Sequence, residues 1–152
     1  MIIKHLAKVV LLLPFILLGC ATDIKTGNRP TVVPTKIKVT FQGQPAVAAT
    51  VTFTNPTSNT SGIGLTGADG TCFLTTFETS DGVTPGAQIV SIRKVEIIDK
   101  SKPGFDYGAS NEIPPPPEER WIIPRKFSDP NTSGLKAEVV AGQKNEIVFD
   151  LN

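Results

Sequence analysis

Histidine is almost absent from this chain: the single histidine, His5, lies close to the N-terminus, in a segment typical of cleaved export signals. Once that segment is removed, no imidazole remains for a Ser-His-Asp triad, a Cys-His pair or a histidine zinc site. Glycine-rich phosphate loops of the Walker or dinucleotide type are also missing from the sequence. We therefore expect a protein that is not an enzyme and that has no catalytic residue, no cofactor and no bound metal ion.

Cysteine is scarce as well, and the first of the two cysteines, Cys20, ends a short apolar run. A positively charged leader with Lys4 and Lys8 is followed by the apolar residues 9–18 and the small residue Gly19. This is the arrangement of a secretory signal peptide. The run is too short for a membrane-spanning helix, which needs roughly 20 apolar residues. We therefore expect residues 1–19 to direct export and then to be removed.

Residues 17–20, Leu-Leu-Gly-Cys, resemble the lipobox of bacterial lipoproteins, although Leu18 is larger than the residue usual at its position. The resemblance implies that the Cys20 thiol receives a diacylglyceryl group and that cleavage follows Gly19. Two or more acyl chains hold a protein stably on a membrane. We therefore expect residues 20–35 to be a lipidated tether and the protein to be anchored in the bacterial cell envelope, in the inner or outer membrane and facing the periplasm or the surface. An ordinary cleaved signal with a chance cysteine is the alternative.

The formal charge narrows the classes of partner, and the second cysteine bears on whether a disulfide can form. Loss of Lys4 and Lys8 lowers the 15 basic residues to 13 against 14 acidic ones, which gives a formal charge of −1. Without a clustered basic face, this balance argues against nucleic acid as a partner. If Cys20 carries lipid, Cys72 has no disulfide partner. Because Cys72 shares a strand face with Leu74, we interpret it as a core residue, with a reactive thiol as the alternative.

Apolar and polar residues alternate with period two through most of the chain after residue 35, which predicts half-buried strands. The alternation is strict at Ile37, Val39 and Phe41, and it shifts near Arg93, which predicts a β-bulge there. The expected strands are residues 36–41, 50–54, 63–65, 71–76, 87–98, 135–139 and 146–151. About seven strands separated by turn residues predict an all-β fold, an antiparallel, immunoglobulin-like β-sandwich over residues 36–152.

Several turn elements, in their order along the chain, resemble carboxypeptidase regulatory-like (peptidase-associated) domains. They are the Gly-Gln-Pro turn at residues 43–45, the Thr-x-x-Asp-Gly element at residues 66–70 and the Pro-Gly step at residues 85–86. Residues 124–135 further resemble a segment near the end of small bacterial lipoproteins that carry this domain. The resemblance implies a transthyretin-like or prealbumin-like sandwich with no established chemistry of its own.

Residues 99–121 interrupt the strand pattern and include four consecutive prolines at positions 114–117. Proline offers no backbone donor to a strand ladder, so we expect an irregular surface loop in which function is concentrated. Tyr107 and Trp121, the only tyrosine and tryptophan, flank the proline run, and Arg120 precedes Trp121. We therefore predict a partner-binding or glycan-binding surface at Tyr107, Arg120 and Trp121. Packing of Trp121 onto the sandwich is the alternative.

The carboxylates of Asp69 and Asp81 could ligate calcium from their loops, but Asp-Gly turns favour a local backbone role for such side chains. Taken together, the sequence predicts a non-catalytic, lipid-anchored cell-envelope protein that acts as an interaction or structural module. A carbohydrate-binding module at the cell surface or in the periplasm is the alternative. The expected partners are the membrane, through lipid on Cys20, and an envelope protein or a polysaccharide.

Overall fold

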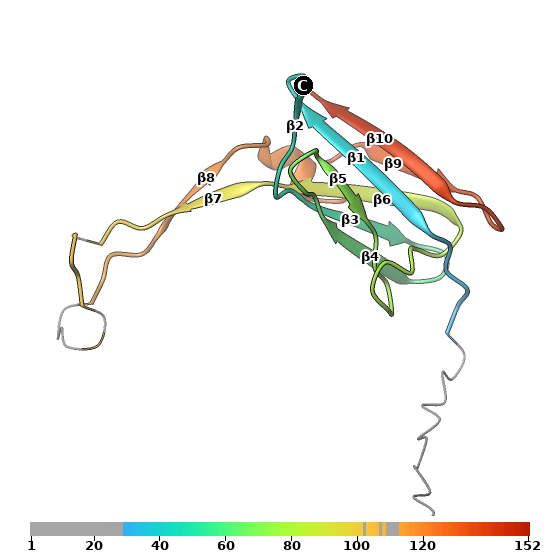
Figure 1. Cartoon of the computed structure of the whole chain (residues 1–152), viewed down its shortest axis with the longest axis horizontal. Coiled ribbons are helices and arrows are strands. Elements are labelled where there is room, and N and C mark those ends of the chain that lie inside the picture. The colour runs from blue at the N-terminus through green and yellow to red at the C-terminus, as the bar shows by residue number, and fades with distance from the viewer. Residues whose placement is uncertain (1–28, 102, 107, 109–112) are drawn as a thin grey trace, which may run out of the picture.

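A computed structural model describes residues 29–101, 103–106, 108 and 113–152. The expected signal peptide, the lipidation site Cys20 and the candidate residue Tyr107 lie outside the described residues. The described chain is all-β, apart from one short 3-10 turn, η1, at Arg125–Ser128 (Figure 1). Its strands are β1 Thr35–Phe41, β2 Gln44–Pro45, β3 Thr50–Asn55, β4 Thr60–Leu65, β5 Thr71–Phe73, β6 Gly86–Arg93, β7 Val95–Ile98, β8 Glu118–Trp121, β9 Leu135–Val139 and β10 Asn145–Leu151.

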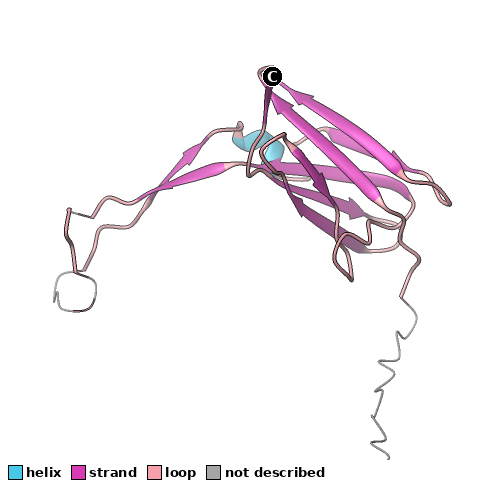
Figure 2. Ribbon diagram, viewed as in Figure 1, coloured by secondary structure: helices cyan, strands magenta, loops and turns pink. Residues whose placement is uncertain are grey.

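Two sheets face each other, which confirms the predicted β-sandwich (Figure 2). One sheet has the order β4-β3-β6-β9, with all neighbours antiparallel. In the other, β1 pairs with β10 on one side and with β2 and β5 on the other side. The pairing of β1 with β10 is parallel, which differs from the antiparallel arrangement that we expected. Alternation predicts a strand and its buried face, but it carries no information about the direction of the neighbouring strand.

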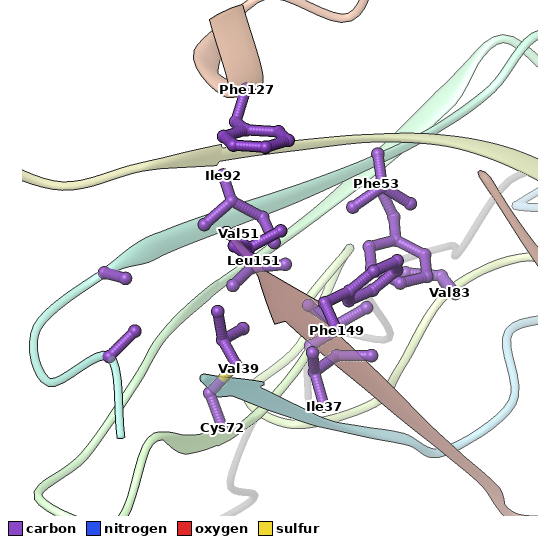
Figure 3. Close-up of a cluster of buried hydrophobic side chains, with 14 of the residues drawn as sticks. Ile37, Val39, Val51, Phe53, Cys72, Val83, Ile92, Phe127, Phe149 and Leu151 are labelled. Carbon is purple, nitrogen blue, oxygen red and sulfur yellow. The ribbon is translucent and has the colours of Figure 1, made fainter. Parts of the chain in front are cut away.

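The core lies between the two sheets and comes from the inward residues of the predicted alternation (Figure 3). Ile37 and Val39 of β1 face Val51 and Phe53 of β3, and all four are fully buried. Phe53 meets the ring of Phe149 on β10 edge to face, with centroids 6.1 Å apart and an interplanar angle of 71°. Such a contact stabilises the sandwich beyond the area that the rings bury.

In strand β4 the glycines face the interior and the large apolar residues face the solvent, the reverse of the usual arrangement. Its inward positions are Gly62 and Gly64, whereas Ile63 and Leu65 are 53% and 66% exposed. A Cβ atom on Gly62 would lie 2.3 Å from Cγ1 of Val83, so only glycine allows this edge strand to approach so closely. The backbone groups of Ile63 then exchange two 2.9 Å hydrogen bonds with Thr75, which follows β5, and these bonds join the two sheets at this edge.

A hairpin of β7 and β8 projects from one end of the sandwich (Figure 1). The predicted strand at residues 87–98 is divided at Lys94: β6 ends at Arg93 inside the sheet, and β7 leaves it. The expected irregular segment needs correction at its C-terminal end, because residues 118–121 form β8 and pair with β7. The carbonyl of Lys94 accepts a 3.0 Å hydrogen bond from the Ile122 amide, which fixes the base of the hairpin.

Candidate functional site

The hairpin base borders a pocket of about 640 Å³, where β8 meets β6 and η1. Ser128 and Thr132 contribute hydroxyl groups, and the rest of the lining is charged or aromatic: Arg93, Glu119, Trp121, Arg125, Lys126 and Asp129. The volume lies within the range of about 300–1,000 Å³ that is common for small-molecule sites. Trp121, one of the predicted site residues, therefore borders a sizeable pocket whose lining is rich in charged side chains.

Trp121 is the last residue of β8 and is half-buried at the hairpin base. Two guanidinium carbons lie over its ring, that of Arg93 at 5.4 Å and that of Arg125 at 5.5 Å from the centroid. Both distances suit a cation–π interaction. Trp121 therefore joins the hairpin to the sandwich, as in the packing alternative, and it also forms part of the pocket wall.

Strand periodicity divides the charged residues of β8 between two sides of the hairpin. Glu119 lies on the same side as Trp121, where its carboxylate pairs with Arg93 at 2.9 Å. Arg120 points to the other side and pairs with Glu96, the residue directly opposite it on β7. Of the predicted candidates, the structure therefore places Trp121 in the pocket and Arg120 outside it.

The short η1 turn supplies the two cations that the sequence analysis did not single out, Arg125 and Lys126. Within the described part of the chain, neither side chain makes an ion pair with a carboxylate. Lys126 instead lies 4.6 Å from the ring centroid of Phe127, which is buried against the core. The adjacent basic residues after Pro124 were the available sequence signal, but only the fold brings them to Trp121.

Hydrogen bonds to the backbone hold the loop between η1 and β9 in place. Thr132 Oγ1 donates to the Lys126 carbonyl at 2.7 Å, and Ser128 Oγ donates to the Arg125 carbonyl at 2.8 Å. Ser133 Oγ donates to the Val90 carbonyl of β6 at 2.6 Å. The part of the pocket wall formed by residues 125–132 is therefore attached to the sandwich sheet through Ser133, whereas Glu119 and Trp121 come from the hairpin.

One more ion pair of the hairpin region lies outside the pocket lining. Lys100, two residues after the end of β7, has its Nζ 2.7 Å from Oε2 of Glu118, the first residue of β8. The hydrogen bond and the charge of Lys100 lower the pKa of the Glu118 carboxyl. Opposite charges placed across two strands stabilise the pair modestly.

The loop carboxylates have local backbone partners. Asp69 accepts hydrogen bonds from the amide and hydroxyl of Thr71, and these bonds lower its pKa. Asp81 accepts hydrogen bonds from the amides of Thr76, Phe77 and Glu78. Among the described residues, no three His, Cys, Asp or Glu side chains gather as a metal site would require.

Cys72 is buried beside Gly64, as predicted for a core residue, and burial raises the pKa of its thiol to about 11. A thiol with such a pKa carries almost no thiolate at neutral pH. In the described residues, no helix is long and apolar enough to cross a membrane.

Comparison with known proteins found no match among protein families, curated proteins or solved structures. Functional inference therefore depends on the residues and geometry of this chain.

Proposed function

We propose that this chain is a lipid-anchored, non-catalytic protein of the bacterial cell envelope, and that its sandwich serves as an interaction or structural module. The resemblance to carboxypeptidase regulatory-like domains is part of the same proposal. The observation that carries it is the β7–β8 hairpin, which extends beyond the sandwich (Figure 1). None of the described side chains between residues 94 and 122 is fully buried. A projection with its own ladder and no share in the core suits contact with a partner.

The position of the hairpin relative to the chain entry supports this function. The described chain enters the sandwich at the start of β1, where the backbone of Val33 bridges to Val83. The hairpin leaves from the other end of the sandwich (Figure 1). A domain held by lipid on Cys20 can therefore present the hairpin away from its attachment point.

Fatty-acid labelling tests the anchor. We expect the wild-type chain to incorporate labelled palmitate and Cys20→Ser to lose the label and accumulate as uncleaved precursor. Cys72→Ser is the matched control, because it removes the other cysteine and should keep the label. Labelling that persists in Cys20→Ser, or a wild-type protein recovered wholly in the soluble fraction, contradicts the proposed anchor.

A second candidate function is carbohydrate binding, favoured by the half-buried Trp121 beside a pocket of polar groups. Such a combination of an aromatic ring with hydrogen-bonding groups suits sugar recognition. A glycan array or a polysaccharide pull-down with wild type and Trp121→Ala tests it. Saturable binding that is lost in the variant supports this function, whereas the absence of binding to every glycan contradicts it.

A further inference from the structure

We propose that the pocket at the hairpin base binds the carboxylate of a sugar acid, such as a uronic acid residue of an acidic polysaccharide, through Arg125. The inference rests on the candidate carbohydrate-binding function and names its ligand class. It changes the expected role of Trp121, because this ring holds an arginine in place rather than stacking on the sugar.

The cations of the pocket are not equivalent. Arg93 is neutralised by Glu119 at 2.9 Å, whereas Arg125 contacts the Trp121 ring and has no carboxylate partner in the described part of the chain. A guanidinium is a planar fork of donors that matches a carboxylate with two parallel hydrogen bonds. The contact with the Trp121 ring restricts the guanidinium in advance and so reduces the entropy lost on binding. Among the described residues, Lys126 also lacks a carboxylate partner, but its ammonium has no planar fork, so Arg125 is the cation best matched to a carboxylate.

The other polar groups of the pocket favour a ligand that also has hydroxyl groups. Glu119 and Asp129 border the pocket and would repel a ligand group that places more than one negative charge inside it. As carboxylates they can accept hydrogen bonds from hydroxyl groups. Ser128 and Thr132 already donate their hydroxyl protons to backbone carbonyls, so their oxygens are left as acceptors. A sugar acid supplies both the single negative charge and the hydroxyl donors that this arrangement requires.

The contacts of the Trp121 ring argue against its use as a simple stacking platform for a sugar. The guanidinium groups of Arg93 and Arg125 already lie over the ring. A neutral sugar that stacked on a ring face covered by a guanidinium would have to displace a cation–π contact worth about 0.5–1 kcal/mol or more. The site is therefore better suited to charge recognition than to stacking of a neutral ring.

Binding of polygalacturonate to the full chain in detergent, measured by calorimetry without divalent cations, tests the proposal. Its methyl ester is the matched neutral polymer. We expect polygalacturonate to bind, the ester to bind at least tenfold more weakly, and Arg125→Gln to weaken polygalacturonate binding by about tenfold, the effect of one charged hydrogen-bonded contact. The control Lys38→Gln removes an exposed charge from the other sheet and should bind as wild type does.

Each contrary result overturns the inference. If the methyl ester binds as tightly as polygalacturonate, the pocket does not recognise the carboxylate charge. If Lys38→Gln weakens binding as much as Arg125→Gln does, the polymer is attracted by the overall charge of the protein and not by a specific site. Poly-L-glutamate that binds as well as polygalacturonate assigns the pocket to acidic peptide instead of sugar. Binding of neutral glycans that depends on Trp121 but not on Arg125 retains the carbohydrate-binding function and rejects only this inference. Circular dichroism of each variant checks that the fold is intact.

Discussion

The sandwich and the hairpin of this protein are held together by different interactions. In the sandwich, apolar residues from both sheets fill the interior (Figure 3). The glycines of β4 allow an edge strand to approach closely. The hairpin has no such interior: Ile97 in β7 is 58% exposed, and Ile113 is 94% exposed. Its strands are held by backbone pairing and by charge pairs such as Glu96 with Arg120.

This difference shows where each kind of substitution should act. Burial of apolar surface and close packing supply most of the stability of a domain. Exposed ion pairs contribute only about 0–1 kcal/mol each. Changes in the sandwich should therefore alter the free energy of unfolding, and changes in the hairpin should alter recognition.

The largest effect is expected from truncating the central aromatic residue of the core. Phe53→Ala leaves a cavity beside Phe149 and should lower the free energy of unfolding by about 3–5 kcal/mol. The matched control, Ile97→Ala, truncates an exposed residue of the hairpin and should change it by less than about 0.5 kcal/mol. Urea denaturation followed by circular dichroism measures both. Similar losses in the two variants would mean that the hairpin belongs to the cooperative core.

Two glycine substitutions compare the sandwich with the hairpin loop by their effect on backbone conformation. Gly82 has φ +96°, and a Cβ atom there would lie 1.8 Å from the Val33 carbonyl oxygen. Gly82→Ala should therefore cost about 3 kcal/mol through strain and overpacking. Gly104, in the loop that β7 and β8 enclose, has φ +79° and no atom within 4 Å of a built Cβ.

Gly104→Ala is the control, because it carries the same kind of backbone strain without a steric clash. We expect a cost of about 1 kcal/mol that is confined to the loop and leaves the thermal midpoint of the sandwich unchanged. A midpoint lowered equally in both variants would contradict the separation of the two regions.

The sandwich could be predicted from the sequence because its strands alternate. The seven strands that alternation predicts cover eight of the ten observed strands, because the prediction for residues 87–98 spans both β6 and β7; the other two are the two-residue β2 and the hairpin strand β8. Alternation failed at β8, because its sequence Glu-Glu-Arg-Trp has no apolar face. Cross-strand charge pairs stabilise that strand instead, and they are invisible until the register is known. The inward face of β4 was hidden for a related reason, since glycines occupy it.

The candidate site could be predicted only in part. The rarity of tryptophan in the chain pointed to Trp121, which does border the pocket. Arg120, its sequence neighbour, lies on the other side of β8, as strand geometry requires once β8 is recognised. Arg93 and Arg125 come from β6 and η1, and their approach to Trp121 depends on tertiary packing that residue spacing does not encode.

A smaller effect is expected at the Asp81 turn, and it depends on pH. Burial opposes ionisation there, but the backbone amides of Thr76, Glu78 and Phe77 together hold the pKa of Asp81 below its ordinary value of 3.8. Because the folded-state pKa is lowered, the stabilisation is complete above the unfolded-state value and is lost as the pH falls through the folded-state value. Asp81→Asn should cost roughly 1 kcal/mol at neutral pH.

The readout for this turn is the difference in unfolding free energy between wild type and Asp81→Asn as a function of pH. It should be constant near neutrality and shrink below about pH 4, where the wild-type carboxylate begins to take up a proton. Glu138→Gln, an exposed acid on β9, is the matched control and should leave stability unchanged. A difference that grows at low pH would have the wrong sign for this turn.

The smallest effect on stability is expected from shortening the hairpin. Ile98 and Glu118 are paired residues, so replacing residues 99–117 by Asn-Gly closes the stem with a two-residue turn. The cost of loop closure falls by only about 0.6 kcal/mol for each halving of loop length. The deletion also removes Lys100, the partner of Glu118, which offsets part of that gain. The thermal midpoint of the sandwich should therefore stay within a few degrees of wild type, as circular dichroism would show, while binding of a partner by the loop is lost.

A Gly/Ser segment of the original length is the control that separates loop length from loop composition. Loss of cooperative unfolding in either variant would place residues 99–117 in the core and would remove the basis for assigning stability to the sandwich and recognition to the hairpin.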